Sequence, residues 1–201
     1  MKRALVAVSL VLLLGACGTS VSDPSASDPS AEAAPTVSSA AEIAAGSTYN
    51  DTDVMFLQML VDHQQQGLEM VAIAADRATR EEVVDLAKAI DATETDELTM
   101  MTSWLTEWQK ATTVDKRVSL HADHGGLPGT DDESIASLRT VEKADFETAF
   151  LNLFLAHQHN AVEMAQLELD KGANEQATAF AERVKESRAD QVQQMLRLLN
   201  G

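Results

Sequence analysis

The chain has 201 residues, which is enough for one folded domain with additional segments. Its 15 Lys and Arg residues against 32 Asp and Glu residues give a formal net charge of −17, so a phosphate backbone would repel it and we expect no nucleic-acid partner. Only 4% of the residues are aromatic, and the many Ala, Leu, Glu and Gln residues favour helices.

Residues 1–16 have the pattern of an export signal. Two basic residues precede an apolar run over residues 4–14, which is too short to span a bilayer as a stable helix. The run ends in Leu-Gly-Ala-Cys17, which resembles a bacterial lipobox and implies that Cys17 is acylated and becomes the mature N-terminus. An ordinary signal peptide with an incidental cysteine is the alternative. Residues 17–48 are rich in Ser, Ala and Pro without helical or strand period, so we predict a flexible tether that holds an extracytoplasmic domain on the cell membrane.

The rest of the chain, residues 49–201, contains one unit twice. Residues 53–105 and 147–199 align without a gap at an offset of 94 positions, which places His63 on His157. Self-similarity over a segment of this length indicates a duplicated structural unit.

Apolar residues recur with a helical period in four long segments. The predicted helices span residues 51–77, 79–108, 145–171 and 174–199, and Gly172 is a suitable residue to end the third. Capping-box patterns at Thr79 and Thr130 predict the start of the second helix and of a short helical segment after the linker, residues 109–130. Each pair of helices has one apolar face and cannot bury it alone. We therefore predict an all-α, ferritin-like up-down four-helix bundle made of two repeated helical hairpins.

Counting equal distances from the two hairpin turns predicts a polar layer at mid-height of the bundle. Its expected members are His63, Glu94, His157 and Arg188, with Gln64 and Gln158 close by. Buried polar groups are unfavourable unless they satisfy one another. In one interpretation Glu94 pairs with Arg188, and the layer serves only to fix the register of the helices.

In a second interpretation the same layer is a metal site. The candidate ligands are His63, His157, Met59, Met70 and Met164. Thioether and imidazole groups together suit copper, especially Cu(I), although methionine at helical spacing also fills apolar cores. A di-iron site is not expected, because no Glu is followed by His three positions later. The linker histidines His121 and His124 are a weaker metal signal, and His159 is expected to project outside the layer.

The two units resemble a family of exported bacterial proteins that is classed as a domain of unknown function. The family motif is of the type HHxxAIxMA, and here it reads HQQQGLEMV from His63 and HQHNAVEMA from His157. Gln64 and Gln158 stand where the family has its second histidine. The resemblance covers residues 50–200 and implies a ferritin-like four-helix bundle. Because some relatives are linked to copper, it also implies metal handling in the cell envelope.

These observations leave two hypotheses for the function, neither of them enzymatic. In the first, the protein is a lipid-anchored bundle that binds or handles a metal ion, most naturally copper. In the second, it is a non-catalytic interaction or scaffold lipoprotein with an envelope protein as partner and a purely structural polar layer. Trp104 and Trp108, one helical turn apart, are either core residues or a contact patch.

Overall fold

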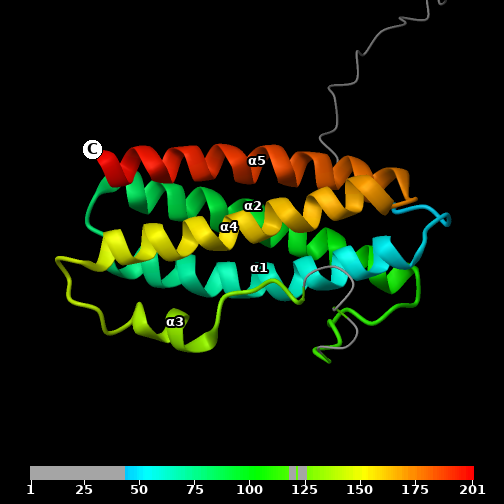
Figure 1. Ribbon diagram of the computed structural model, residues 1–201, viewed down its shortest axis with the longest axis horizontal. Helices are drawn as coiled ribbons and strands as arrows, with labels where there is room; N and C mark the ends of the chain where they lie inside the picture. Colours follow the sequence, from blue (N-terminus) through cyan, green and yellow to red (C-terminus); the bar gives the residue numbers. More distant parts are fainter. Residues whose placement is uncertain (1–43, 118–120, 122–125) are drawn as a thin grey trace, which may run out of the picture. The chain divides into compact units, whose positions relative to one another are not determined.

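The computed structural model describes residues 44–117, 121 and 126–201, which form a four-helix bundle (Figure 1). Its helices are α1 (Asp51–Arg77), α2 (Glu81–Glu107), α3 (Asp132–Ser137), α4 (Phe146–Lys171) and α5 (Glu175–Asn200). The predicted all-α, ferritin-like bundle of two repeated hairpins, α1 with α2 and α4 with α5, is confirmed. The predicted export signal, Cys17, most of the predicted tether and His124 lie outside the described residues. No helix in the described part of the chain is both long and apolar enough to cross a bilayer.

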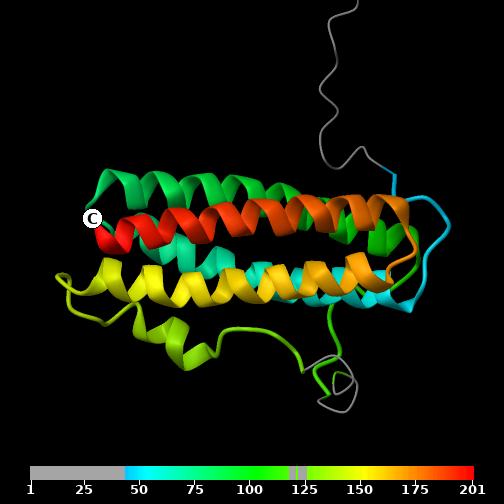
Figure 2. The same cartoon turned by 45° about the horizontal axis from the view of Figure 1, so that its top comes forward.

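The two hairpins meet mainly along α1 and α4, which run in opposite directions (Figures 1 and 2). The connection between the hairpins returns along the bundle, with α3 against α1, before α4 begins. As a result α2 and α4 run in the same direction, as they do in ferritin-like bundles with one long crossover.

Each hairpin turn is capped by a carboxylate from the other hairpin. Glu147, in the first turn of α4, accepts hydrogen bonds from the backbone amides of Thr79 (2.7 Å) and Arg80 (2.8 Å), where α2 begins. Asp53, its counterpart in α1, accepts from two successive amides of the α4–α5 turn at 3.0 and 2.8 Å. Amides at the start of a helix have no partner within the helix. Each hairpin therefore binds the backbone that leads into the second helix of the other.

These contacts explain why the two predicted capping boxes are wrong. The N-cap of α2 is Arg80, whose side chain forms no cap hydrogen bond, and Glu147 binds the amides of Thr79 and Arg80 from outside the hairpin. The Thr79 hydroxyl donates to Glu147 instead, at 3.0 Å. At α3 the N-cap is Asp131, whose carboxylate accepts from a backbone amide at 2.8 Å, and Thr130 turns into the bundle.

Gly172 ends α4 as predicted, but for a different reason than the one expected. Its φ of −65° is open to any residue, so no left-handed conformation is needed. A Cβ at this position would overlap the carboxyl group of Glu168, which lies fully buried one turn earlier. The glycine therefore makes room for a buried carboxyl group.

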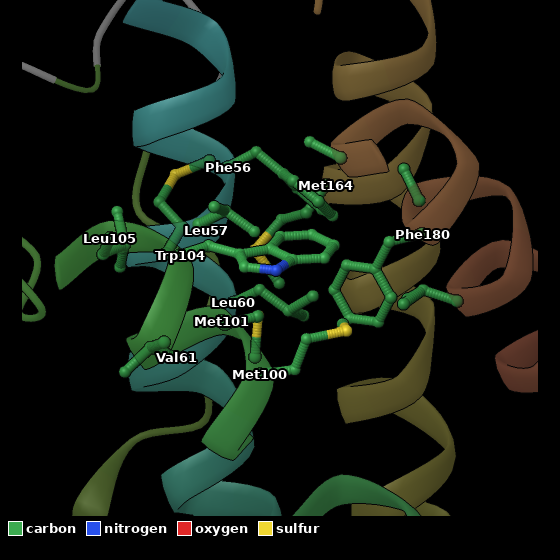
Figure 3. Close-up of a cluster of buried hydrophobic side chains, with 14 of the residues drawn as sticks. Phe56, Leu57, Leu60, Val61, Met100, Met101, Trp104, Leu105, Met164 and Phe180 are labelled. Carbon is green, nitrogen blue, oxygen red and sulfur yellow. The ribbon is translucent and has the colours of Figure 1, made fainter. Parts of the chain in front are cut away.

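Two apolar clusters fill the bundle, one toward each end. The first contains the side chains shown in Figure 3, among them Phe56, Met101, Trp104, Met164 and Phe180. The second contains Met70, Ile73, Val83, Ile90, Phe146, Phe150, Phe154 and Met195. Trp104 and Trp108 are 1% and 6% exposed, so both belong to the core and do not form a surface patch. The clusters are separated by a layer of buried polar side chains.

The chain joins the bundle a few residues before α1. Ala45 is fully buried, and Trp108 Nε1 donates to the carbonyl of Gly46 at 2.7 Å. Asn174 Nδ2 donates to the carbonyls of Ala45 (2.6 Å) and Thr48 (2.8 Å). Residues 44–48, which the sequence analysis assigned to the tether, thus pack on the end of the bundle.

Candidate metal site at the centre of the bundle

The centre of the layer is a pair of stacked histidines from the two copies of the repeat. The rings of His63 and His157 lie 3.6 Å apart between centroids with an interplanar angle of 10°, and both side chains are buried. His63 Nε2 lies 3.0 Å from the backbone carbonyl of His157, which can only accept, so Nε2 carries the proton.

Both imidazoles are held in the neutral form. Burial lowers the pKa of His63 to about 3, and the nearby Arg188 guanidinium also lowers it. Burial likewise lowers the pKa of His157 well below its usual value, with contributions from His63 and Arg188. A neutral imidazole keeps a lone pair for a metal ion without first losing a proton.

The second histidine has a different set of partners from the first. Its Nδ1 lies 2.9 Å from the hydroxyl of Thr130, a buried residue of the connection between the hairpins. The amide of Thr130 donates to Gln66 Oε1 on α1 at 3.0 Å, which anchors the connection to the seam between α1 and α4. His157 Nε2 is buried without a hydrogen-bond partner.

Beside the histidines, one guanidinium faces two carboxyl groups. Arg188 is fully buried; its Nη2 lies 3.4 Å from Glu94 Oε1 and also forms an ion pair with Glu97. Gln158 Nε2 donates to the same Glu94 oxygen at 3.1 Å. Burial raises the pKa of Glu94 to about 7, although Arg188 acts in the opposite direction. With both carboxyl groups ionised, these three side chains lack one positive charge.

The layer has more hydrogen-bond acceptors than donors. Gln64 Nε2 donates to Glu97 at 2.5 Å, and its repeat counterpart Gln158 donates to Gln191 at 2.8 Å. Within the described residues, the buried layer atoms without a partner are the acceptors Gln64 Oε1, Gln158 Oε1, Glu94 Oε2 and His157 Nε2 and the donor Arg188 Nε. Unsatisfied buried acceptors favour the uptake of a water molecule, a proton or a cation.

A glycine in the middle of α1 lets two of these acceptors pack against the helix backbone. A Cβ on Gly67 would lie 2.7 Å from Glu94 Oε2 and 3.0 Å from His157 Nε2. The corresponding residue in the second copy is Ala161, which has a side chain. No sequence pattern predicts Gly67, Thr130 or Glu97 as site residues. A lone glycine inside a long helical pattern was the available signal for Gly67, because it lowers helix stability and usually has a packing or functional reason.

The structure does not gather the predicted methionines around the histidines. Met59 and Met164 lie in the first apolar cluster, whereas Met70 lies in the second. Met164 is surrounded by aromatic and aliphatic side chains in Figure 3. Met70 and Met164 each follow their histidine by seven residues, about 10 Å along a helix, and the antiparallel helices carry them in opposite directions. One ion cannot contact all five predicted ligands in this arrangement.

The remaining groups give a mixed result for metal binding. The described residues contain no group of three or more His, Cys, Asp or Glu side chains that could hold a metal ion. His159 is exposed, as expected, and His121 contacts the carbonyl of Asp115 at 2.5 Å. Against this, the unpartnered oxygen of Glu94 and nitrogen of His157 are suitable donors for a copper ion. The unpartnered acceptors of the layer are therefore nitrogen and oxygen atoms, and the predicted thioethers lie in the two apolar clusters.

Comparisons with known proteins agree with this architecture. The family model described as a domain of unknown function (DUF305) matches residues 53–199. A DUF305 protein from Streptomyces coelicolor, described as a candidate secreted protein, has 27% identity and a TM-score of 0.69, over 74% of this chain and 92% of that one. A DUF305 fragment from Deinococcus radiodurans has 21% identity and a TM-score of 0.66, over 77% and 99%. CopM in its Cu(I)-bound form has 22% identity and a TM-score of 0.60, over 75% and 97%. No curated protein matches the chain.

Proposed function

The chain belongs to the DUF305 family, and on that premise we propose that it is an extracytoplasmic, lipid-anchored protein that binds a copper ion in the cell envelope. The observation that carries the proposal is the buried layer, in which the neutral imidazole of His157 and the carboxyl group of Glu94 each have a donor atom without a hydrogen-bond partner. Structures of the similar protein CopM with Cu(I) and with Cu(II) support copper as the ion. Copper binding in the envelope needs no catalytic residues, and we propose no enzymatic activity.

The location rests on the N-terminal sequence and on one relative. The apolar run ending at Cys17 has the form of a lipobox, and the S. coelicolor relative is described as secreted. We expect Cys17→Ser to abolish incorporation of labelled fatty acid and to release the protein from the membrane fraction. Equal membrane association of the variant and the wild type would contradict the lipid anchor.

Each residue of the layer would have a different role in binding the ion. His157 would supply an imidazole lone pair, and Glu94 would supply negative charge. Arg188 would oppose a cation, but it also holds the Glu94 carboxyl group in place. A bound copper ion would satisfy acceptors and, with Glu94 and Glu97 both ionised, supply the positive charge that these side chains and Arg188 lack.

A copper titration of the purified full-length protein tests this proposal. We expect one saturable site that is lost in His157→Gln, because this change removes the imidazole that faces the layer. His159→Gln is the matched control, since His159 lies two residues away on the same helix and is exposed. Binding that is weak, unsaturable and lost with added salt in the wild type would contradict an internal site, because it would reflect only the net charge.

A scaffold protein with a structural layer is the second candidate. It is favoured by the ion pairs of Arg188 with Glu94 and Glu97, which partly neutralise the layer without a metal. Under this alternative the His157 and His159 variants would bind copper equally weakly, and His157→Gln would change only stability.

A further inference from the structure

Part of the connection between the hairpins lies directly over the polar layer. Residues 126–130 form neither helix nor strand and pass along the seam between α1 and α4 on the way to α3 (Figures 1 and 2). We call this segment the strap. Its last residue, Thr130, contacts both helices and lies against the imidazole of His157, which is 1% exposed. The strap therefore lies on the solvent side of this imidazole.

Neutral hydrogen bonds hold the strap on the helices. The Thr130 hydroxyl lies 2.9 Å from His157 Nδ1, and the Thr130 amide donates to Gln66 Oε1 at 3.0 Å. Asn160 Nδ2 donates to the carbonyl of Gly129 at 3.5 Å, which is long for a hydrogen bond. A segment with so few contacts opens at a lower free energy than the helices that it covers.

The opposite side of the layer, between α2 and α5, is closed in a different way. Arg188 on α5 forms ion pairs with Glu94 and Glu97 on α2, and Gln158 donates to Gln191 at 2.8 Å. Separating the partners of a buried ion pair is strongly unfavourable, whereas a neutral hydrogen bond contributes little net free energy. The strap is therefore the weaker of the two covers.

The strap contacts the histidine of the second copy. His63, the repeat counterpart of His157, has its Nε2 on the carbonyl of His157, inside the bundle. The two copies are joined by one connection, so the strap gives the two histidines different surroundings. His157 should respond to changes in the strap, and His63 should not.

We infer that the strap is a cover for the polar layer, and that its local opening gives solvent and small polar molecules access to His157 while the four long helices stay folded. This inference concerns the protein without any metal and does not depend on the proposed copper function. A copper ion that binds in the layer would enter by the same opening.

Modification of the metal-free, full-length protein with diethyl pyrocarbonate at neutral pH tests the inference. The lone pair of a neutral imidazole attacks a carbonyl carbon of the reagent and displaces ethyl carbonate, and burial lowers the pKa of both layer histidines enough to keep them in this form. Peptide mass spectrometry measures each histidine separately. We expect His159, which is exposed, to react fastest, His157 to react more slowly and His63 to react slowest.

Two variants weaken the strap without changing a histidine. Thr130→Val removes the hydroxyl that contacts His157, and Gln66→Leu removes the acceptor of the Thr130 amide. Each should speed the modification of His157 about fivefold, which is the effect of one lost hydrogen bond on the opening equilibrium, and should leave the rate at His63 unchanged. Gln191→Leu is the matched control, because it removes one hydrogen bond on the α2–α5 side, and it should leave the rate at His157 unchanged.

Hydrogen exchange separates local opening from unfolding of the whole bundle. The Thr130 amide is bound to Gln66, so its exchange reports opening of the strap. Local opening exposes little surface and depends weakly on denaturant, whereas global unfolding depends on it strongly. In low concentrations of urea we therefore expect the exchange of Thr130 and the modification of His157 to stay nearly constant. Modification of His63 should accelerate with urea.

Two results would overturn the inference. One is a modification rate that rises with urea equally at His63 and His157, because access would then require global unfolding. The other is a His157 rate that Gln191→Leu increases and Thr130→Val does not, because access would then lie between α2 and α5. Both results come from metal-free protein, so they leave the copper proposal to be decided by its own titration.

Discussion

At both ends of the bundle a carboxylate binds the backbone amides of a hairpin turn, but the negative charge of that carboxylate has different surroundings at the two ends. At the α1–α2 turn, burial would raise the pKa of Glu147, but hydrogen bonds from Arg80 and Thr79 lower it to about 2, and the Arg80 guanidinium lies 2.7 Å away. At the α4–α5 turn, Asn174 replaces Arg80 and brings no charge. There a second carboxyl group, Glu168, stands beside the capping carboxylate of Asp53, and burial together with that neighbouring carboxylate raises the pKa of Glu168 to about 9. The negative charge at the α1–α2 turn is balanced by the Arg80 guanidinium, whereas a second negative charge at the α4–α5 turn is avoided because Glu168 keeps its proton.

The centre of the bundle shows the same divergence between copies. The repeat positions of Glu94 and Arg188 carry opposite charges, and they meet across the layer at 3.4 Å. The positions of Gly67 and Ala161 differ by one methyl group. The two copies thus share one backbone arrangement, and their sequence differences create a charge pair and let two polar side chains pack against α1 at Gly67.

The largest effect is expected from removing the charge at the centre. Arg188→Met would leave Glu94 and Glu97 facing one another without their cation, and loss of one partner of a buried ion pair typically lowers the free energy of unfolding by about 3–5 kcal/mol. Urea unfolding at neutral pH measures this change. The triple variant with Glu94→Gln and Glu97→Gln should recover most of the loss. A single variant as stable as the wild type would show that the ion pair has no structural weight.

At the α1–α2 turn we expect Glu147→Gln to lower stability by about 2 kcal/mol at neutral pH, because the amides and the guanidinium lose a charged acceptor. The depressed pKa means that the wild-type contribution is present above the ordinary value of 4.5 and is lost as the pH falls through about 2. The two proteins should therefore converge in acid. Glu163→Gln, at an exposed site on the same helix, is the control and should differ from the wild type by little at any pH. A constant difference down to the acid limit would contradict the ion-pair explanation.

The opposite pH dependence is expected at the α4–α5 turn. The pKa of Glu168 is raised from 4.5 to about 9 in the folded protein. Between these two pH values the folded protein keeps the proton that the unfolded chain has already released, so wild-type stability falls as the pH rises through this window. Glu168→Gln is neutral at all pH values and should be more stable than the wild type by about 1–2 kcal/mol near pH 8, with little difference near pH 5. Urea unfolding at the two pH values measures the change, and a variant that is less stable at both would show that the carboxyl proton is not the reason.

The smallest effect concerns the glycine at the centre. Gly67→Ala should change stability by less than about 1 kcal/mol, because improved helix propensity offsets the displacement of two side-chain ends. Ala161→Gly should lower stability by about 1 kcal/mol, since it only removes a favourable helix residue. Thermal melts of both variants provide the measurement. A large loss in Gly67→Ala would show that the Glu94 and His157 side chains cannot move away from the added Cβ.

The sequence was sufficient for the architecture and for the height of the polar layer. The offset between the repeats and the two turns determine which residues of antiparallel helices lie level with one another, and this places His63, Glu94, His157 and Arg188 together without any knowledge of side-chain contacts. It was insufficient for the methionines, because equal spacing from a histidine does not say toward which end of the bundle a helix runs.

Contacts between residues far apart in the sequence could not be predicted from local sequence patterns. The carboxylate that binds the backbone at the start of α2 is Glu147, which is 67 residues from Arg80, so the local Thr-x-x-Glu pattern at Thr79 predicted the wrong partner. The prediction for Thr130 was wrong for the same reason. Its position suggested the start of a helix, but its hydroxyl contacts a histidine 27 residues away.

The reciprocal caps bear on how such a chain could have arisen. A precursor with only one copy would have carried a capping carboxylate with no turn to serve and a turn with no carboxylate to serve it. A second identical chain, related by a two-fold axis, would correct both defects at once. The bundle therefore has the internal organisation of a fused homodimer, in which covalent linkage freed each half to change separately.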